Sequence, residues 1–215
     1  LKKNNLKKIV VLGAGSGGDI EALSAHLPKS AEITLTDLHP DQGFVSSRSN
    51  ISYRQQSVDA FAVPKDLDGA RVLYSVFHHF KPEQATSFFK TVVRDRQPVA
   101  IFEVTERSVL GLIVVLLVPF LVLVLTPWVR PFSWKRLFFT YVVPVLPILI
   151  FWDGLISAFR TYTRSELHQM TEEHMGYDWN FGYVYGPRKE RVSYFTGMPK
   201  TITDVFPKMP ATDVL

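Results

Sequence analysis

Residues 10–23 read VVLGAGSGGDIEAL, and this stretch decides the fold of the chain. The apolar run Ile9 to Leu12 stops at a group of glycines, and a segment with apolar residues at helical spacing, 19–26, follows it. A short apolar run before a glycine-rich turn is typical of a buried parallel strand that leads into a ligand-binding loop. The glycines permit a tight turn, close approach of a ligand to the backbone, and contact of that ligand with the N-terminus of the next helix.

The alternation of strand and helix patterns continues beyond this loop. Pro82 favours the start of a helix, and Thr163 with Glu166 forms a capping box for another. Strands are expected at 32–36, 51–55, 70–76, 99–104, 179–185 and 192–195. The helix that begins near Pro82 is expected over 81–93. The sequence therefore predicts an α/β fold: a Rossmann-like doubly wound sheet, mostly parallel, with an antiparallel C-terminal strand pair.

Two acidic residues follow the predicted strands at positions where a nucleoside ligand would need acceptors. Asp37 ends the second strand, roughly twenty residues after the glycine loop, where a carboxylate can accept both hydroxyls of an adenosine ribose. Asp59 lies in the sequence SVDAF, where its carboxylate can accept from an adenine amino group while Val58 and Phe61 offer apolar contact. Both aspartates also suit solvated turns.

At these residues the chain resembles the class I S-adenosylmethionine-dependent methyltransferases, over residues 8–106 and 160–198. The resemblance rests on the glycine loop at 13–18, Asp37, VDA at 58–60, LYSVFHHF at 73–80, and the closing helix with its antiparallel strands. It implies S-adenosylmethionine as the cofactor, with the methionine moiety along the glycine loop, the ribose at Asp37 and adenine near residues 58–60. The implied cofactor-binding residues are Gly13, Ala14, Gly15, Gly17, Asp37, Leu38, Val58, Asp59, Ala60 and Ser75.

The chain departs from the pattern of that family at one position. The family usually has an acidic residue two positions before the first glycine, and this chain has Val11. Backbone carbonyls near Gly13 or Ser75 would then have to anchor the amino group of the methionine moiety.

Two adjacent histidines are the candidates for catalysis. His78 and His79 follow the fourth strand, where the ligand crevice of a doubly wound sheet opens, and a histidine there can act as a general base near neutral pH. Because adjacent side chains point in different directions, at most one of the two would face a substrate; both could instead pack or cap. Glu103 and Glu106, after the fifth strand, are expected to contact the substrate or, preferentially, to pair with Arg107.

Two other readings of the same motifs stay open. An NAD(P)-dependent Rossmann oxidoreductase also uses a glycine loop followed by an acid, although the close of this chain is short for a second mononucleotide half. A non-catalytic membrane adaptor with a methyltransferase-like fold would explain Val11. Methyl transfer is the preferred function.

Composition narrows the chemistry further. The chain of 215 residues has no cysteine, so disulfides, thiolate nucleophiles and cysteine-based zinc sites are excluded. The histidine pair lacks further ligands at metal-binding spacing, and we predict no metal. The formal net charge of +4 comes from scattered Lys and Arg residues, which argues against nucleic acid and is more compatible with an anionic lipid surface.

An apolar segment interrupts the methyltransferase-like pattern. Residues 108–126 and 137–152 carry no charge, and the basic, tryptophan-containing sequence PWVRPFSWKR lies between them. Such a composition is typical of a membrane interface. Two spans would put the three cations of this loop, which has no acidic residue, on the far side of the membrane, against the positive-inside tendency. Because the second run is also short and both runs contain prolines, we expect an inserted helical hairpin that lies in the interface or enters one leaflet. A two-span hairpin, a buried lid in a soluble protein and an oligomer interface are the alternatives.

The expected organisation follows from these segments. Residues 1–106 and 153–200 form one methyltransferase-like domain, 107–152 form the membrane-associating insertion, and 201–215 form a tail. No signal peptide is apparent, so the protein is expected on the cytoplasmic side of a membrane, which it contacts through residues 108–152. The expected acceptor is a lipid or another lipophilic small molecule.

Overall fold

The computed structural model describes residues 7–17, 30–185 and 191–200. Within it the chain forms two compact units: residues 1–104 with 164–215, and residues 105–163. The predicted helix at 19–26, the turn at 186–190 and the tail at 201–215 lie outside the described residues.

The first unit is built on a seven-stranded sheet with the order β3-β2-β1-β4-β5-β7-β6. Its strands are β1 (Lys8–Leu12), β2 (Glu32–Thr36), β3 (Ile51–Tyr53), β4 (Ala70–Tyr74), β5 (Val99–Glu103), β6 (Tyr177–Tyr185) and β7 (Arg191–Pro199). The strands β1 to β5 are mutually parallel, whereas β7 runs antiparallel to both β5 and β6. The predicted sheet, including its antiparallel C-terminal pair, is confirmed.

The helices of this unit begin where the sequence signals place them, but several strands differ in length from the prediction. The helices are η1 (Phe77–His79), α2 (Pro82–Arg94) and α6 (Arg164–Thr171), and Pro82 is the first residue of α2. The predicted strands 51–55 and 70–76 are too long, because the chain leaves the sheet after Tyr53 and Tyr74. The last strand, predicted as 192–195, extends over nine residues because it pairs with β5 on one side and β6 on the other.

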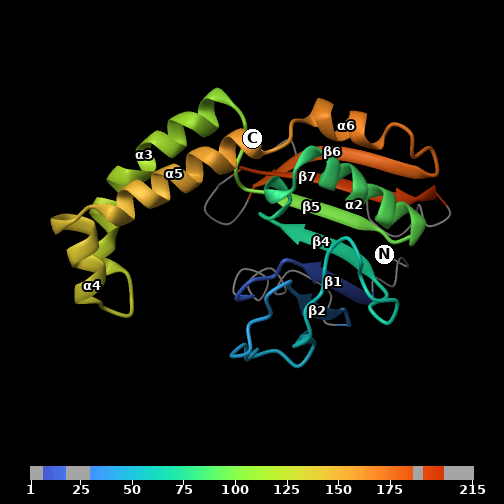
Figure 1. Ribbon diagram of the computed structural model, residues 1–215, viewed down its shortest axis with the longest axis horizontal. Coiled ribbons are helices and arrows are strands. Elements are labelled where there is room, and N and C mark those ends of the chain that lie inside the picture. The colour runs from blue at the N-terminus through green and yellow to red at the C-terminus, as the bar shows by residue number, and fades with distance from the viewer. Residues whose placement is uncertain (1–6, 18–29, 186–190, 201–215) are drawn as a thin grey trace. The chain divides into compact units, whose positions relative to one another are not determined.

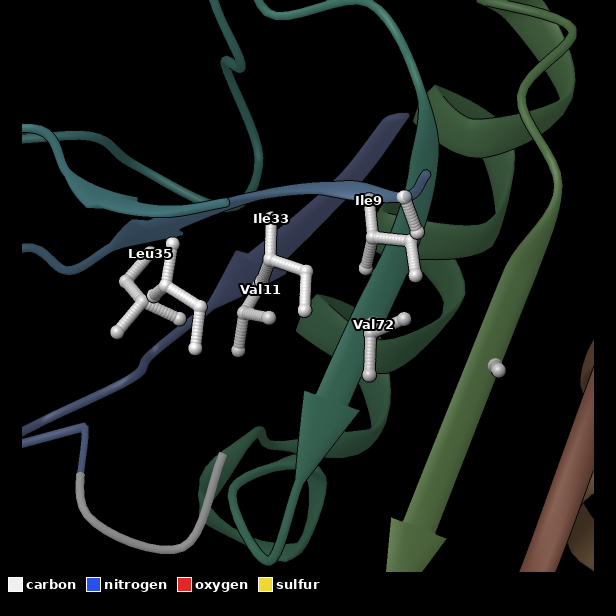
Figure 2. Close-up of a cluster of buried hydrophobic side chains, with 8 residues drawn as sticks. Ile9, Val11, Ile33, Leu35 and Val72 are labelled. Atoms are coloured by element: carbon white, nitrogen blue, oxygen red, sulfur yellow. The ribbon is translucent and has the colours of Figure 1, made fainter. Parts of the chain in front are cut away.

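One face of the sheet carries an apolar cluster around β1. Its buried members are Ile9, Val11, Ala31, Ile33, Leu35, Ile51, Val72 and Ala100. Alternation along each strand puts these side chains on the same face, since successive residues of a strand point to opposite sides. Figure 2 shows the side chain of Val11 beside that of Ile33 within this cluster. Position 11 is therefore a core position.

The opposite face is covered by α2 and α6, which lie side by side (Figure 1). Phe89 of α2 packs against Phe195 of β7 and Trp179 of β6, with ring centroids 5.8 and 5.5 Å apart. Phe77 of η1 packs against Phe89 at 5.4 Å. These aromatic contacts hold the carboxyl end of β4, and with it η1, against the helix layer, which fixes the position of the residues that follow β4.

The second unit consists of two long helices and a set of short ones. They are α3 (Val109–Leu125), η2 (Thr126–Trp128), α4 (Trp134–Leu137), the π-helix η3 (Phe138–Val142) and α5 (Val145–Arg160). α3 and α5 pack against each other as a hairpin (Figure 1). A Cβ atom added to Gly154 of α5 would lie 3.5 Å from Val115 of α3, and the hydroxyl groups of Thr105 and Thr161 form a hydrogen bond of 2.8 Å. The helix α5 continues past residue 152 to Arg160.

Candidate functional site

The carboxyl ends of the parallel strands form one edge of the sheet, and the predicted site residues follow these strands. The connection after β1 leads to β2 on one side of the sheet, and the connection after the neighbouring strand β4 leads to β5 on the other side. Ligands of doubly wound sheets bind at such a switch point, outside the carboxyl ends of the strands. The glycine loop follows β1 and Ser75 follows β4, so both lie at this switch point.

Two glycines of the loop have distinct structural roles. Gly15 has φ +52°, and a Cβ built on it would meet no heavy atom of the described residues within 4 Å, which leaves space among them for a ligand to approach the backbone. Gly17 has φ +74°, and a Cβ there would lie 2.6 Å from Phe44 and 2.8 Å from Leu35. Gly15 is therefore the glycine that a ligand would use, and Gly17 is required for packing.

Asp37 connects the second strand to the glycine loop. The Gly15 N–H donates to Asp37 Oδ2 and the His39 N–H donates to Asp37 Oδ1, each at 2.8 Å. A carboxylate has about four acceptor sites, so each oxygen retains capacity for one further donor. The two backbone bonds fix the orientation of the carboxylate, which suits it to accept a pair of vicinal hydroxyls.

Tyr53 supports the loop from the third strand. Its hydroxyl donates to the Gly15 carbonyl oxygen at 2.8 Å. Partial burial, together with the negative charges of Asp37 and Asp41, raises the pKa of the Tyr53 phenol above its ordinary value. The phenol therefore remains a donor over the physiological pH range. Tyr53 was not predicted as a site residue, since nothing in the sequence indicates this bond across 38 positions.

Ser75 has two unusual features. Its φ is +51°, a left-handed conformation that is uncommon for residues other than glycine, and its N–H donates to the Phe102 carbonyl at 2.8 Å. Its Oγ is buried, and no described residue forms a hydrogen bond with it. A buried hydroxyl without a partner is costly, and strained residues of this kind gather at ligand sites. A polar group of a bound cofactor would satisfy this hydroxyl.

The predicted adenine-side residues form a turn after β3. The Val58 N–H donates to the Asp37 carbonyl at 2.9 Å, and the Val58 side chain is buried. The Asp59 carboxylate is exposed and accepts from the Phe61 N–H at 2.9 Å. Ala60 is half-buried, and Leu38 is exposed. The structure thus brings this turn to Asp37, while Asp59 also has a role in the local turn.

His78 and Glu103 form a buried pair at the ends of β4 and β5. Glu103 Oε1 accepts from the His78 backbone N–H at 3.1 Å, and Glu103 Oε2 lies 2.7 Å from His78 Nδ1. Both side chains are nearly inaccessible to solvent. When Nδ1 carries the proton and donates it to the carboxylate, Nε2 is left as an acceptor, which is the arrangement of a positioned general base. Sequence reasoning identified both residues but assigned Glu103 chiefly to Arg107.

The other histidine of the pair has a different environment. His79 is exposed, and its ring centroid lies 4.3 Å from that of His78. Adjacent positions therefore differ in orientation, as expected. Within the described residues no three His, Asp or Glu side chains gather as a metal ion would require.

Val11 lies where the resemblance would place an acidic residue. Its side chain is 2% exposed within the apolar cluster, and its carbonyl accepts from Thr36 Oγ1 at 2.8 Å. A carboxylate at this position would be buried among apolar side chains without a partner, at a large free-energy cost. Valine therefore suits the core here, and the Ser75 hydroxyl, at the carboxyl end of β4, has no hydrogen-bond partner among the described residues.

Comparison with solved structures gives matches over most of the chain. The fold is similar to that of the plantazolicin methyltransferase BpumL in complex with SAH, with a TM-score of 0.54, 12% identity, and coverage of 90% of this chain and 76% of that one. It is also similar to human N-acetylserotonin methyltransferase in complex with SAM, with a TM-score of 0.52, 14% identity, and coverage of 90% of this chain and 48% of that one.

A third match is a SAM-dependent methyltransferase from Aquifex aeolicus, with a TM-score of 0.50, 11% identity, and coverage of 91% of this chain and 84% of that one. A scan of the sequence against protein-family profiles gives no match, and a search of curated proteins gives none either. At these identities the likeness concerns the fold. The chain has the Rossmann-like fold of the class I S-adenosylmethionine-dependent methyltransferases.

Proposed function

We propose that this protein is an S-adenosylmethionine-dependent methyltransferase that acts on a lipophilic acceptor at a membrane. The observation that carries the proposal is the edge of the sheet at the β1–β4 switch point. There the open Gly15, the oriented Asp37 carboxylate and the unpaired Ser75 hydroxyl follow strands whose order is that of the class I methyltransferase fold. An antiparallel β7–β6 pair closes the sheet, which disfavours the second parallel mononucleotide half of an NAD(P) enzyme.

The residues of this edge fit the cofactor by their chemistry. Asp37 would accept the ribose hydroxyls, the backbone at Gly15 would lie against the methionine moiety, and Ser75 would bind its polar end. Val58 and Asp59 would frame adenine. The cofactor supplies a methyl group on a positively charged sulfur, which is already activated for displacement.

The chain has two further tasks in such a reaction: to orient the acceptor and to remove its proton. We assign proton removal to His78, with Nε2 as the accepting atom. Glu103 holds Nδ1 and the backbone N–H of the same residue, so it fixes the ring orientation and stabilises the imidazolium after proton transfer. Burial of the pair excludes water from the proton acceptor.

The lipophilic acceptor is inferred from the second unit. Its apolar hairpin begins a few residues after β5 along the chain, and most of the exposed large apolar side chains of the described residues belong to positions 109–159. Large exposed apolar surfaces mark contacts with membranes, other proteins or apolar ligands. A methyltransferase that carries such a surface is suited to acceptors that reside in a bilayer.

The test is transfer of an isotope-labelled methyl group from S-adenosylmethionine to a total lipid extract in the presence of the full chain. Mass spectrometry would identify the labelled acceptor by its added methyl mass. We expect labelled lipid with the wild-type chain and with the His168→Gln control, and loss of labelling with His78→Ala. His168 of α6 packs against the Phe195 ring, with centroids 5.8 Å apart, and has no role assigned in the reaction. Labelling of water-soluble metabolites alone would contradict the lipophilic acceptor, and absence of cofactor binding would contradict methyl transfer.

A further inference from the structure

The outward surface of α3 is apolar along its whole length. Exposed positions run from Val109 to Leu125, and the side that packs toward α5 includes Val115, the one buried residue among the seventeen of the helix. No polar side chain occurs between Val109 and Leu125. A helix of a soluble protein normally has a polar side facing water, and a helix that is apolar all round is typical of a membrane span or a buried core.

We propose that α3 and α5 cross the lipid bilayer as a hairpin, with the segment 126–136, here called the tip, in the far headgroup layer. This deepens the membrane half of the proposed function and is independent of methyl transfer. The sequence favoured an insertion into one leaflet, and the helix geometry leads us to propose full crossing. Three features carry this inference: length, the chemistry of the tip and the depth of the charged residues.

The length of the first helix matches a bilayer. Val109–Trp128 forms a continuous helical stretch of 20 residues with a mean hydropathy of 3.1 over its most apolar window, of which 11% is buried. At 1.5 Å per residue it extends for about 30 Å, the thickness of the hydrocarbon core. A helix that entered one leaflet would need about half that apolar length.

The tip has the composition of a headgroup layer. Trp128, Phe132 and Trp134 are exposed, and so are the cations Arg130 and Lys135. Tryptophan and cations of this kind anchor the ends of membrane spans, where they contact lipid phosphates and carbonyls. Arg136 serves the fold of the tip instead. Its Nη2 donates to the carbonyl oxygens of Val129 and Pro131, at 2.5 and 2.7 Å.

The depth of the charges distinguishes crossing from shallow insertion. Gly154 of α5 lies beside Val115 of α3, so the exposed Asp153 is about 9 Å from the start of α3, about 16 Å from the first residue of the tip and about 20 Å from Trp128. Insertion of one leaflet up to Asp153 would place Arg130 and Lys135 near the bilayer centre, where charged side chains are most costly. Crossing places both cations in the far headgroup layer and leaves Asp153 as the one charged side chain between the ends of α3 and α5, about 12 Å from the start of α5.

The bend before α5 fits the same arrangement. The helices Trp134–Val142 and Val145–Arg160 meet at 78°. If α5 crosses the bilayer, the segment 134–142 lies nearly parallel to the membrane plane at the far surface. Besides Trp134 and Lys135 of the tip, the exposed residues of this segment are Phe138, Phe139, Tyr141 and Val142, which are mainly aromatic, as is common at membrane interfaces.

The experiment uses the absence of cysteine from the chain, so that single-cysteine variants of the full chain carry one reactive thiol each. Val129→Cys places it in the tip, Leu117→Cys in the middle of α3, and Ser87→Cys on the exposed side of α2. Each variant is expressed in bacterial membranes, and right-side-out and inverted sealed vesicles are treated with a membrane-impermeant maleimide. Carbonate washing of the same membranes separates inserted from peripheral protein.

Crossing predicts that Val129→Cys and Ser87→Cys react in opposite vesicle orientations, and that Leu117→Cys reacts in neither until detergent is added. Reaction of the tip and of α2 from the same side would overturn the proposal in favour of one-leaflet insertion. Recovery of the chain in the soluble or carbonate-released fraction would overturn it in favour of a lid or an interface between copies. Binding of S-adenosylhomocysteine, measured on the same variants in detergent, tests the cofactor claim separately, so the two failures are distinguishable.

Discussion

Replacement of Asp37 by asparagine should weaken the binding of S-adenosylhomocysteine by roughly 10- to 150-fold. The carboxylate accepts two backbone N–H groups at 2.8 Å, one on each oxygen, and would accept one ribose hydroxyl on each with its remaining capacity. Hydrogen bonds to a charged acceptor contribute about 1.5–3 kcal/mol, and loss of that amount corresponds to the stated change in Kd.

Asparagine keeps the size of the side chain but has only one acceptor oxygen. Its amide NH2 must face either the Gly15 N–H or the His39 N–H, so one of the two backbone bonds is lost together with the acceptor that the ribose would use. The glycine loop is therefore expected to loosen as well. We expect a fall of about 1 kcal/mol in the free energy of unfolding without ligand, because one hydrogen bond of a partly exposed group is lost.

Isothermal titration calorimetry of the full chain with S-adenosylhomocysteine measures the affinity, and thermal unfolding confirms that the variant folds. Asp41→Asn is the matched control. Asp41 lies in the same connection after β2, and its carboxylate accepts from the Gly43 N–H at 2.9 Å without a role assigned to it in cofactor binding. The control should bind within about twofold of the wild type. If Asp37→Asn binds equally well, the assignment of Asp37 to the ribose is refuted.

Further predictions concern the buried pair, a buried phenol and the glycine loop. Glu103→Ala leaves the two donors of His78 buried and unpaired, so urea denaturation should show a loss of about 3–5 kcal/mol in the free energy of unfolding. A double-mutant cycle with His78→Ala should give a coupling energy above about 1 kcal/mol. Additive effects of the two substitutions would show that the residues do not form a pair. Burial raises the pKa of Tyr177 to about 12 from 10.0, so its contribution is present below pH 10 and is lost as the pH rises toward 12. The difference in unfolding free energy between wild type and Tyr177→Phe should therefore fall by about 2–3 kcal/mol over that window, and a constant difference would contradict the assignment. Gly15→Ala should lower the free energy of unfolding by only about 1 kcal/mol but reduce cofactor affinity. Gly17→Ala should lower the free energy of unfolding more, because its Cβ collides with two side chains. An equal loss of stability in the two variants would show that the loop is positioned differently.

The sequence predicted the sheet well because its local signals agree with the long-range structure. The central strands β1, β4 and β5 are mainly apolar, and the runs around Val10 and Leu73 are buried on both faces of the sheet. The antiparallel pairing of the last two strands was predicted from the loop between them and from the family resemblance, whereas their order in the sheet was not predicted. The predicted ends of β3 and β4 were wrong, because these strands end where pairing with the neighbouring strands ends, and the hydropathy of the sequence does not show where pairing ends.

The candidate site was predictable in its residues but not in its pairings. Glycines and acids at the ends of strands have sequence signatures, and the structure brings Gly15 and Asp37 together by a direct hydrogen bond. The His78–Glu103 pair depends on the alignment of β4 with β5, which sets two residues 25 positions apart side by side. The sequence suggested Arg107, which is nearer in the chain, and gave no signal for His78 as a partner of Glu103.

For the apolar hairpin, too, the sequence identified the residues better than it identified the ends of the helices. The uncharged runs at 108–126 and 137–152 identified its apolar residues, but prolines in the second run suggested an interrupted helix. In the structure the break comes at residues 143–144, Pro147 lies in the first turn of α5, and the helix then continues to Arg160. Pro147 is tolerated there because the N–H groups of a first helical turn have no intrahelical partner.

The central claim, that the switch-point edge binds S-adenosylmethionine, is tested most directly by calorimetric titration of the purified wild-type chain. S-Adenosylhomocysteine and NADH are titrated separately under identical conditions, in detergent that keeps the hairpin in solution. The account predicts saturable binding of one S-adenosylhomocysteine per chain and no binding of NADH. Saturable binding of NADH, or no heat with either ligand at millimolar concentration, would contradict it.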